Sequence, residues 1–364
     1  MCELKVYKLG DACTELSDGL HKAPIFVEGG DYIFVNAKNI AKGFIVDNDP
    51  TKKSTKEEYL KYSSPLNETT ILYSIDGTIG NIALYRGEKC ILGKGACYMN
   101  PNPQILDRMY LYYTLQSPHF NAYIDQMSTG STIQHISLKT MRNYVFTCPP
   151  LDEQKQIASV LSSLDDKIDL LNRENATLEA MAETLFRQWF IEEAKEEWEE
   201  GKLGDLIEVK YGKDHKKLHD GNIPVFGSGG IMRYADTALY DKESVLIPRK
   251  GSLNNVMYIN EPFWTVDTMF YTEMRRPNIA KFIYHFMKGQ DLANMNVGSA
   301  VPSMTTEVLN NILIDIPSQD VFDKFEDSVV PLYNKKEQNN KQIQTLIYTR
   351  DGLIPKLMSD EVKM

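Results

Sequence analysis

The sequence predicts an α/β (α+β) protein in which two similar mixed domains are joined by two long helices. Three observations predict this fold: a tandem repeat, a heptad pattern of apolar residues, and pairs of apolar runs that meet at Gly-containing turns. The chain has 364 residues, 42% hydrophobic and 25% charged, which suits a soluble protein of two or three domains. We expect domains over residues 1–150 and 198–318, and helices over residues 151–197 and 319–364.

The repeat is clearest between TGSTIQHISLKTMRNYVFTCP (129–149) and VGSAVPSMTTEVLNNILIDIP (297–317). Gly130 aligns with Gly298, and the offset of 168 positions is constant along both segments. Two further pairs continue the duplication: KLGD at 8–11 and 202–205, and ILYSIDGTIGNIALY at 71–85 with VLIPRKGSLNNVMYI at 245–259. A duplication whose cores persist while its loops diverge is typical of two like modules that recognise two unlike targets.

Heptad spacing predicts the first long helix. Its apolar residues recur at alternating intervals of four and three, with Asn175 as the one polar member. The members are Ile157, Leu161, Leu164, Ile168, Leu171, Asn175, Leu178, Ala182, Leu185 and Trp189. The pattern indicates a coiled-coil seam or a long amphipathic core helix, and either needs a helix of about 35–45 residues. Asp152 marks its start, and Gly201 and Gly204 its stop.

The second helix repeats the first at the same offset, which carries Leu161 to Val329. Its heptad seam contains fewer apolar residues, because Lys336 and Asn339 occupy the positions of Ile168 and Leu171 in the first helix. Pro331 predicts a kink or a delayed start, since proline cannot donate a backbone hydrogen bond.

Each domain is also predicted to contain a strand–turn–strand hairpin. In both, an apolar run enters a glycine, Gly77 or Gly251, and a second apolar run returns. Asn and Ser or Thr residues at the tip would project polar side chains from the turn.

The acidic net charge is local. The chain carries a formal charge of −10, but residues 151–200 alone hold 5 basic and 14 acidic residues. Residues 1–150 hold 15 of each sign and residues 201–318 hold 13 of each. The domains are therefore neutral overall, and the bulk charge does not exclude a nucleic-acid partner.

Cysteine usage and hydropathy predict a cytoplasmic protein without a membrane partner. The five cysteines are scattered and never form a CxxC pair, which indicates free thiols rather than disulfides or a zinc site. No apolar run approaches the roughly 18 residues of a membrane span, and the N-terminal residues do not resemble a secretion signal.

Taken in order, these motifs resemble the specificity subunit of type I restriction–modification systems over essentially the whole chain. The matching stretches are GSTIQHIS and CPPLDEQKQIASVLSSLDDKI within 130–168, LFRQWF at 185–190, the two KLGD copies, GSAVPSMT at 298–305 and LIPKLMS at 353–359. Valine and phenylalanine at 321–322 replace the Glu-Gln pair of the first copy, and SDE at 359–361 replaces the common Ser-Gly-Glu.

The resemblance implies two target-recognition domains that each contact one half of a bipartite site in double-stranded DNA. It implies spacer helices packed antiparallel, so that the domains are related by a pseudo-twofold. Two adenine methyltransferase subunits would dock on this scaffold, and motor–nuclease subunits would join for restriction. The chain itself would be no enzyme and hold no cofactor, and S-adenosylmethionine is expected on the partner methyltransferase.

Alternatives to this function rest on two short motifs. Glu208 and Lys210 follow an apolar pair as in the metal-binding half of a nuclease site, so a Mg²⁺-dependent nuclease-like enzyme is one alternative. His215 and His219 have helical i,i+4 spacing, but no further His or Cys clusters with them, and we predict no metal site. A coiled-coil protein scaffold without DNA binding is the third interpretation. The chain shows neither a methyltransferase (N/D)PP(Y/F) motif nor a Walker A lysine.

Polar and basic loops are the candidate DNA contacts, because their side chains can bond base edges and phosphates. In the first domain the candidates are Asn36, Lys38, Asn39, Thr78, Asn81, Ser131, Thr132, Gln134 and His135. In the second they are Lys213, Lys216, Lys217, Arg249, Lys250, Asn254 and Asn255. Solvated loops and structural turns would show the same residues.

The acidic helix face is the candidate partner-binding surface. Glu179, Glu183, Glu192 and Glu193 would repel phosphates, so we expect them to face away from DNA and to contact the partner subunit.

Overall fold

The computed structural model describes residues 4–41, 43–49, 51–128, 134–295 and 303–358. The chain forms two compact units: unit 1 comprises Met1–Leu171 with Lys341–Met364, and unit 2 comprises Asn172–Asn340. Each unit therefore contains part of both long helices. The four-part division at residues 150, 197 and 318 stays a prediction, because these units cut the chain elsewhere.

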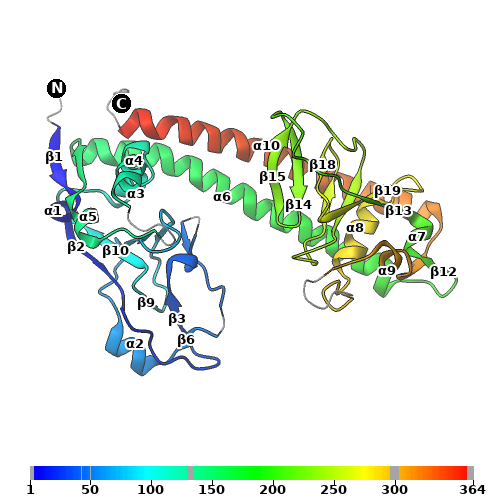
Figure 1. Ribbon diagram of the computed structural model, residues 1–364, viewed down its shortest axis with the longest axis horizontal. Coiled ribbons are helices and arrows are strands. Elements are labelled where there is room, and N and C mark those ends of the chain that lie inside the picture. Colours follow the sequence, from blue (N-terminus) through cyan, green and yellow to red (C-terminus); the bar gives the residue numbers. More distant parts are fainter. Residues whose placement is uncertain (1–3, 42, 50, 129–133, 296–302, 359–364) are drawn as a thin grey trace. The chain divides into compact units, whose positions relative to one another are not determined.

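Unit 1 is built on a four-stranded antiparallel sheet of order β2–β10–β7–β8, of which β2 and β10 are labelled in Figure 1. These strands are β2 (Cys13–Asp18), β7 (Ile71–Ser74), β8 (Ile82–Leu84) and β10 (Ala96–Pro101). A second sheet of order β6–β3–β9 contains β3 (Tyr32–Val35), β6 (Lys53–Ser54) and β9 (Cys90–Leu92), with β3 and β9 parallel. Two strand pairs complete the unit: β1 (Lys5–Lys8) with β11 (Val145–Cys148), and β4 (Ile40–Ala41) with β5 (Phe44–Ile45).

Short helices cover the core of unit 1. They are α1 (Leu9–Ala12), η1 (Ala37–Asn39), α2 (Lys56–Tyr62), α3 (Arg108–Thr114), α4 (Pro118–Met127) and α5 (Leu138–Asn143). Side chains cap the N-termini of two of them. The Asp107 carboxylate accepts hydrogen bonds from two backbone N–H groups of α3, and the Ser117 hydroxyl accepts one from the backbone N–H of Phe120 in α4. Tyr73, Tyr113 and Phe120 are fully buried in the core.

Unit 2 has the same strand order. Its main sheet is β13–β19–β16–β17, formed by β13 (Ile207–Tyr211), β16 (Ser244–Pro248), β17 (Met257–Ile259) and β19 (Met269–Met274). Its second sheet is β15–β14–β18, formed by β14 (Ile223–Gly227), β15 (Gly230–Ala235) and β18 (Trp264–Thr265), with β14 and β18 parallel. The pair β12 (Glu199–Lys202) and β20 (Leu313–Ile316) corresponds to β1 and β11. The sequence repeat is therefore a repeat of topology.

Among the described residues, unit 2 has fewer short helices than unit 1. Those of unit 2 are α7 (Leu203–Leu206), α8 (Ala280–Lys288) and α9 (Thr306–Asn310), and α8 packs on β16 and β17. Phe270, Phe282, Phe322 and Phe325 are fully buried in the core of this unit.

The predicted hairpins are confirmed in both units. Strand β7 pairs with β8 and β16 pairs with β17, each antiparallel. Gly77 and Gly251 at the turns have φ of 77° and 86°, a left-handed conformation that favours glycine. The repeated glycine is thus explained by the turn.

Both long helices form. Helix α6 runs over Leu151–Arg187, 37 residues, and continues as a π-helix over Gln188–Glu192. Helix α10 runs over Gln319–Met358, 40 residues, and includes Pro331. The delayed start predicted for this helix is wrong. Val329 before the proline and Tyr333 after it pack on the same core, and this packing holds the helix together on both sides of the missing N–H.

The two helices contact each other within each unit. In unit 2, Asn175 Nδ2 donates to Asn340 Oδ1 at 2.8 Å, and Glu179 pairs with Lys336. Residue numbers therefore increase along α6 where they decrease along α10, which means that the two segments run antiparallel in this unit. In unit 1, Arg350 Nη1 lies 2.7 Å from Asp165 Oδ1. Within the described residues, no helix is long and apolar enough to cross a membrane.

Candidate nucleic-acid interface

Four segments of unit 1 converge at one edge of its sheets, and we call this surface loop edge 1. It comprises the residues that follow β2 (Gly19–Leu20), residues 36–39 after β3, the β7–β8 turn (76–81) and residues 93–95 after β9. Backbone bonds join them: Lys94 N donates to Leu20 O at 2.8 Å, and Ile75 N donates to Gly95 O at 3.0 Å. The Asn81 side-chain amide donates to Ala37 O at 3.4 Å.

The equivalent segments of unit 2 form loop edge 2. They are residues 212–217 after β13, 228–230 after β14, the β16–β17 turn (249–255) and residues 266–268 after β18. Lys213 N donates to Thr265 O and Arg249 N donates to Thr268 O, both at 2.8 Å. The Asn255 side-chain amide donates to Ser228 O at 2.8 Å.

A matched pair of glycines allows this convergence. A Cβ on Gly19 would lie 2.1 Å from Leu92 O, and a Cβ on Gly212 would lie 2.1 Å from Val266 O. Only glycine permits so close an approach of one loop to the next. The loop edges are therefore part of the repeated architecture, although their sequences differ.

The structure brings together most predicted residues of the first domain at loop edge 1. Lys38 and Thr78 are exposed, and the Lys38 ammonium lies 3.2 Å from the Asp49 carboxylate. Gln134 is also exposed, and its carbonyl accepts from Gly77 N at 3.0 Å, which places it beside the β7–β8 turn. His135 is half-buried, with Nδ1 3.9 Å from Asp76 Oδ1. Ser131 and Thr132 lie outside the described residues.

Three of the predicted asparagines hold loops together. Asn39 is only 3% exposed, and its amide donates to Val46 O at 3.0 Å and to Asn48 Oδ1 at 2.8 Å. Its Oδ1 accepts from Asn36 N at 3.1 Å. Asn81 and Asn255 make the same bond in the two units, from the hairpin turn to the loop after β3 or β14.

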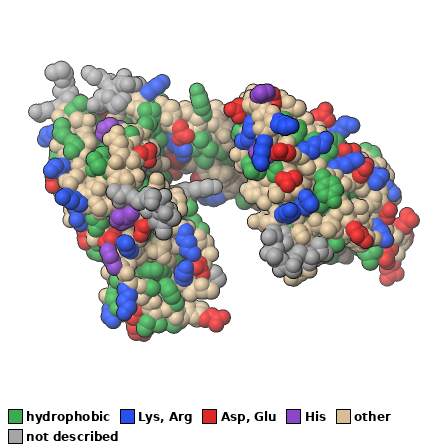
Figure 2. All heavy atoms as spheres, viewed as in Figure 1, with side chains coloured by type: hydrophobic (Ala, Val, Ile, Leu, Met, Phe, Trp, Pro, Cys, Tyr) green, Lys and Arg blue, Asp and Glu red, His purple; other side chains and the backbone are tan. Residues whose placement is uncertain are grey.

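Loop edge 2 carries the stronger positive charge. Lys213, Lys216 and Lys217 are exposed, and none has an acidic partner at ion-pair distance in the part of the chain described. Lys250 is likewise exposed. On the visible face of unit 2, Lys and Arg side chains are interspersed with Asp and Glu side chains and with apolar ones (Figure 2).

Arg249 is held in place at this edge. Its guanidinium lies 5.2 Å from the centroid of the Tyr211 ring, and Nη1 donates to Asp267 O at 3.1 Å. A stacked and hydrogen-bonded guanidinium is preorganised for a fork-like bond to guanine or phosphate. Asn254 Oδ1 accepts from Ala293 N at 3.2 Å, which anchors the far end of the turn.

Sequence reasoning missed Tyr211, Ile231 and Met232 at this edge. All three are more than half exposed, but in the sequence an aromatic or aliphatic residue of a strand looks like a core residue. Tyr73, Tyr98 and Phe270, by contrast, are aromatic residues of strands that lie buried in the cores.

The two short motifs, Glu208 with Lys210 and His215 with His219, do not form a metal site in the structure. Glu208 and Lys210 lie on β13, where Lys210 Nζ pairs with Glu208 Oε1 at 2.5 Å. His215 and His219 lie in a loop rather than on a helix, so their i,i+4 spacing places no two ligands on one helix face. Within the described residues, no group of three His, Cys, Asp or Glu side chains could hold a metal ion.

The acidic helix face is divided between a buried and an exposed part. Glu179 is paired within unit 2, where its carboxylate contacts Lys288, Lys336 and the Tyr284 hydroxyl. Glu183 is 62% exposed and lies 3.9 Å from Lys288. Glu192 and Glu193 are exposed at the end of the π-helix. Glu179 therefore joins α6, α8 and α10 inside unit 2.

Glu179 gives unit 2 an acid-sensitive contact. Burial opposes ionisation, but the bonds from Lys288, Lys336 and Tyr284 outweigh it and lower the pKa of Glu179 from 4.5 to about 2. Because this folded-state pKa is depressed, the stabilisation is present above about pH 4.5 and is lost as pH falls toward 2.

We expect Glu179→Gln to lower the free energy of unfolding by about 2–3 kcal/mol at pH 7, with a smaller difference at pH 3. Urea unfolding at the two pH values measures it. Glu183→Gln is the matched control, and its cost should stay below about 1 kcal/mol because that carboxylate is exposed. An equal effect of both substitutions at pH 7 would contradict the role of Glu179.

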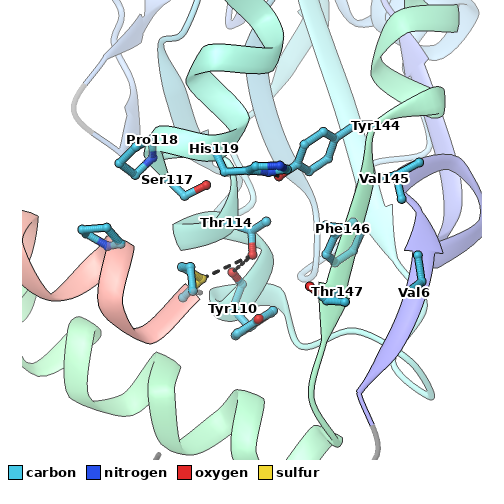
Figure 3. Close-up of a pocket in the computed structure, with 12 residues that line it drawn as sticks. Val6, Tyr110, Thr114, Ser117, Pro118, His119, Tyr144, Val145, Phe146 and Thr147 are labelled. Carbon is cyan, nitrogen blue, oxygen red and sulfur yellow. Dashed lines mark hydrogen bonds between the residues drawn. The ribbon is translucent and has the colours of Figure 1, made fainter. Parts of the chain in front are cut away.

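A pocket in each unit lies away from the loop edges. That of unit 1 has a volume of about 490 Å³ and is lined by β11, α3, the start of α4 and the end of α10 (Figure 3). His119 Nδ1 and the Tyr144 hydroxyl form a hydrogen bond of 2.8 Å on its wall. The corresponding pocket of unit 2 has a volume of about 230 Å³. Its lining residues Phe190 and Leu313 are repeat partners of Met358 and Val145 in the first pocket.

Comparison with known proteins agrees with this architecture. The family model of the type I restriction modification DNA specificity domain matches residues 1–180 and 195–347. The type I restriction enzyme MjaIX specificity subunit of Methanocaldococcus jannaschii is 25% identical, over 92% of this chain and 88% of the relative. The MjaVIII specificity subunit of the same organism is 22% identical, over 82% and 80%.

A solved structure shows the same fold. The crystal structure of a type I restriction–modification S subunit from Mycoplasma genitalium superposes with a TM-score of 0.61 at 20% identity, over 100% of this chain and 97% of that one. Repeated topology, paired loop edges and the family match over both halves lead to one assignment, which confirms the resemblance seen in the sequence. The chain belongs to the family of type I restriction–modification DNA specificity domains and is a specificity subunit, the component that recognises DNA sequence.

Proposed function

We propose that units 1 and 2 each read one half of a bipartite site in double-stranded DNA, through loop edges 1 and 2. The observation that supports this most is a contrast: the strand order of the two units is the same, while the side chains on their loop edges differ. One framework with two unlike sets of polar side chains suits two unlike half-sites.

At loop edge 2 the side chains divide into those that suit phosphate contacts and one that suits a base contact. Lys213, Lys216 and Lys217 are long, exposed cations and suit phosphates. Arg249 is fixed by Tyr211 and Asp267 and suits a guanine edge in the major groove. At loop edge 1, Lys38, Thr78, Gln134 and His135 are the proposed contacts, while Asn36, Asn39 and Asn81 position their loops.

The helices α6 and α10 form the proposed spacer. An antiparallel coiled-coil pair would relate the two units by a pseudo-twofold and set the gap between half-sites. In unit 2 the α6–α10 contact is polar where the seam has Asn175, which is 8% exposed and bonded to Asn339 and Asn340. A buried polar pair of this kind favours one register, since a slip would leave its amides unpaired.

The proposed partners are two adenine methyltransferase subunits, with motor–nuclease subunits joining for restriction. The chain supplies recognition, and S-adenosylmethionine and the chemistry belong to the methyltransferase. Glu183, Glu192 and Glu193 remain exposed and are the proposed acidic contacts with a partner. The repeat-related pockets support two equivalent partner positions, because each unit presents the same kind of apolar recess.

The isolated chain is expected to bind DNA weakly, because the two neutral domains neutralise few phosphates, and this binding should weaken further as the salt concentration rises. Sequence-specific binding with nanomolar affinity should require the partner methyltransferase. Titration of the site-bearing duplex by fluorescence anisotropy, with and without that partner, at two salt concentrations, tests the proposal. A duplex with one half-site scrambled is the control. Equal affinity of the complex for both duplexes would overturn the function, and nanomolar specific binding by the chain alone would overturn the dependence on the partner.

A further inference from the structure

We propose that Ile231 and Met232 of unit 2 read thymine methyl groups in the major groove of DNA. The inference rests on the proposed function of loop edge 2. Ile231 and Met232 follow Gly230 at the start of β15, and they are 52% and 58% exposed. Contiguous exposed apolar side chains, unlike scattered single ones, mark contact surfaces.

The local backbone turns these side chains outward. Ile231 pairs with Phe226 and Arg233 pairs with Val225, so Met232 is the extra residue of a β-bulge. Bulges re-aim side chains at the edges of sheets. The Met232 thioether lies across Gly227, where an added Cβ would come within 2.5 Å of Sδ. The glycine thus gives Met232 its place at the tip of the β14–β15 hairpin.

The tip belongs to loop edge 2. Ser228 in the turn accepts the hydrogen bond from Asn255, and a Cβ on Gly251 would lie 3.0 Å from Ser228 Oγ. A Cβ on Gly229 or Gly230 would meet nothing within 4 Å, so the outer side of the turn is open. The apolar pair therefore lies beside the turn that carries Arg249 and Lys250.

The surrounding charge favours DNA as the occupant. Exposed Lys216, Lys217 and Lys250 belong to the same loop edge and complement phosphates. Arg233, the next residue of β15, is held by Leu218 O at 3.0 Å and by Asp220 Oδ1 at 3.1 Å. Within a basic surface, an apolar side chain finds one matching group in the major groove, the C5 methyl of thymine.

The corresponding strand of unit 1 carries no exposed pair of apolar side chains. The edge strand β6 occupies the place of β15 and consists of Lys53 and Ser54. Lys53 pairs with Asp47, and the Ser54 hydroxyl donates to Ile25 O at 2.6 Å. Methyl recognition by this strand is therefore confined to the half-site of unit 2.

The test compares thymine with deoxyuridine, which differs only in the missing methyl. Methylated adenines are first mapped in cells that carry this protein and its partner methyltransferase, to obtain the site. Each thymine of the half-sites is then replaced singly by deoxyuridine, and binding of the assembled complex is measured. We expect about four-fold weaker binding for at least one replacement, the factor that corresponds to burial of one methyl group.

The variants assign that effect to the hairpin. In the double variant Ile231→Ala, Met232→Ala the difference between thymine and deoxyuridine at that position should vanish, whereas Met232→Leu should retain it. Met181→Ala, an exposed methionine on α6, is the matched control and should leave the ratio unchanged. No deoxyuridine effect at any position, or an effect that persists in the double variant, would overturn the inference. Loss of discrimination between specific and scrambled duplexes by the parental complex would instead overturn the proposed function.

Discussion

Replacing Lys281 with alanine is expected to lower the free energy of unfolding by about 3–5 kcal/mol, because it leaves a buried carboxylate without its partner. Lys281 on α8 is 4% exposed, and its ammonium lies 2.5 Å from Glu326 Oε1 and 2.9 Å from Glu243 Oε1. Glu326 on α10 is 8% exposed. Burial raises the pKa of Glu326, and the bond from Lys281 opposes that rise.

The lysine is enclosed by more than its carboxylates. Its ammonium lies 5.1 Å from the Tyr258 ring centroid and 5.5 Å from that of Tyr333, and the Tyr258 hydroxyl donates to Glu243. The network joins β17, α8 and α10. Truncation would therefore remove cation–π contacts as well as the ion pair.

Urea unfolding followed by circular dichroism measures this loss. The double variant Lys281→Met, Glu326→Met removes both charges and is expected to recover most of the stability, since apolar residues of similar volume replace buried ion pairs at little cost. Lys324→Ala is the surface control, because its pair with Asp320 is 65% and 73% exposed, and it should cost less than about 1 kcal/mol. A Lys281→Ala loss no larger than that of the control would contradict the buried network.

The fold was predictable from sequence where periodicity and turn chemistry act locally. The heptad pattern predicted α6, and the glycines at 77 and 251 marked the two hairpins, because a positive φ needs glycine. Pro331 misled the prediction for α10, because residues distant in sequence hold the helix around it.

The candidate site was only partly predictable. The type of a residue does not show whether its side chain is free to contact DNA or instead holds a loop in place. Asn39, Asn81 and Asn255 have side chains that suit bases, and the structure shows each side-chain amide bonded to the backbone of a loop. Glu179 looked like an exposed acid of a helix face but is paired with two lysines. Those partners lie more than 100 positions away, so spacing alone could not reveal them.

Lengthening both helices by one turn is expected to widen the gap between the two half-sites. Helix α6 passes from unit 1 to unit 2 at Leu171/Asn172, and α10 passes back at Asn340/Lys341. Four residues inserted at each point add about 6 Å, at 1.5 Å per residue. Matched insertions keep the polar contact of Asn175 with Asn339 and Asn340 within unit 2. An insertion in α6 alone would shift its register against α10, so we expect it to weaken assembly.

At about 3.4 Å per base pair, the gap of unread DNA should grow by one or two pairs while both half-sites stay unchanged. Sequencing of methylated adenines in cells that carry the variant and the partner methyltransferase measures the gap directly. The control is a four-residue insertion between Glu193 and Glu197, after the π-helix, which lengthens the chain but neither helix and should preserve the parental gap. An active variant with lengthened helices and the parental gap would show that the helices do not set the spacing. The half-sites should stay the same because the side chains that read them lie on the loop edges, and no insertion touches those.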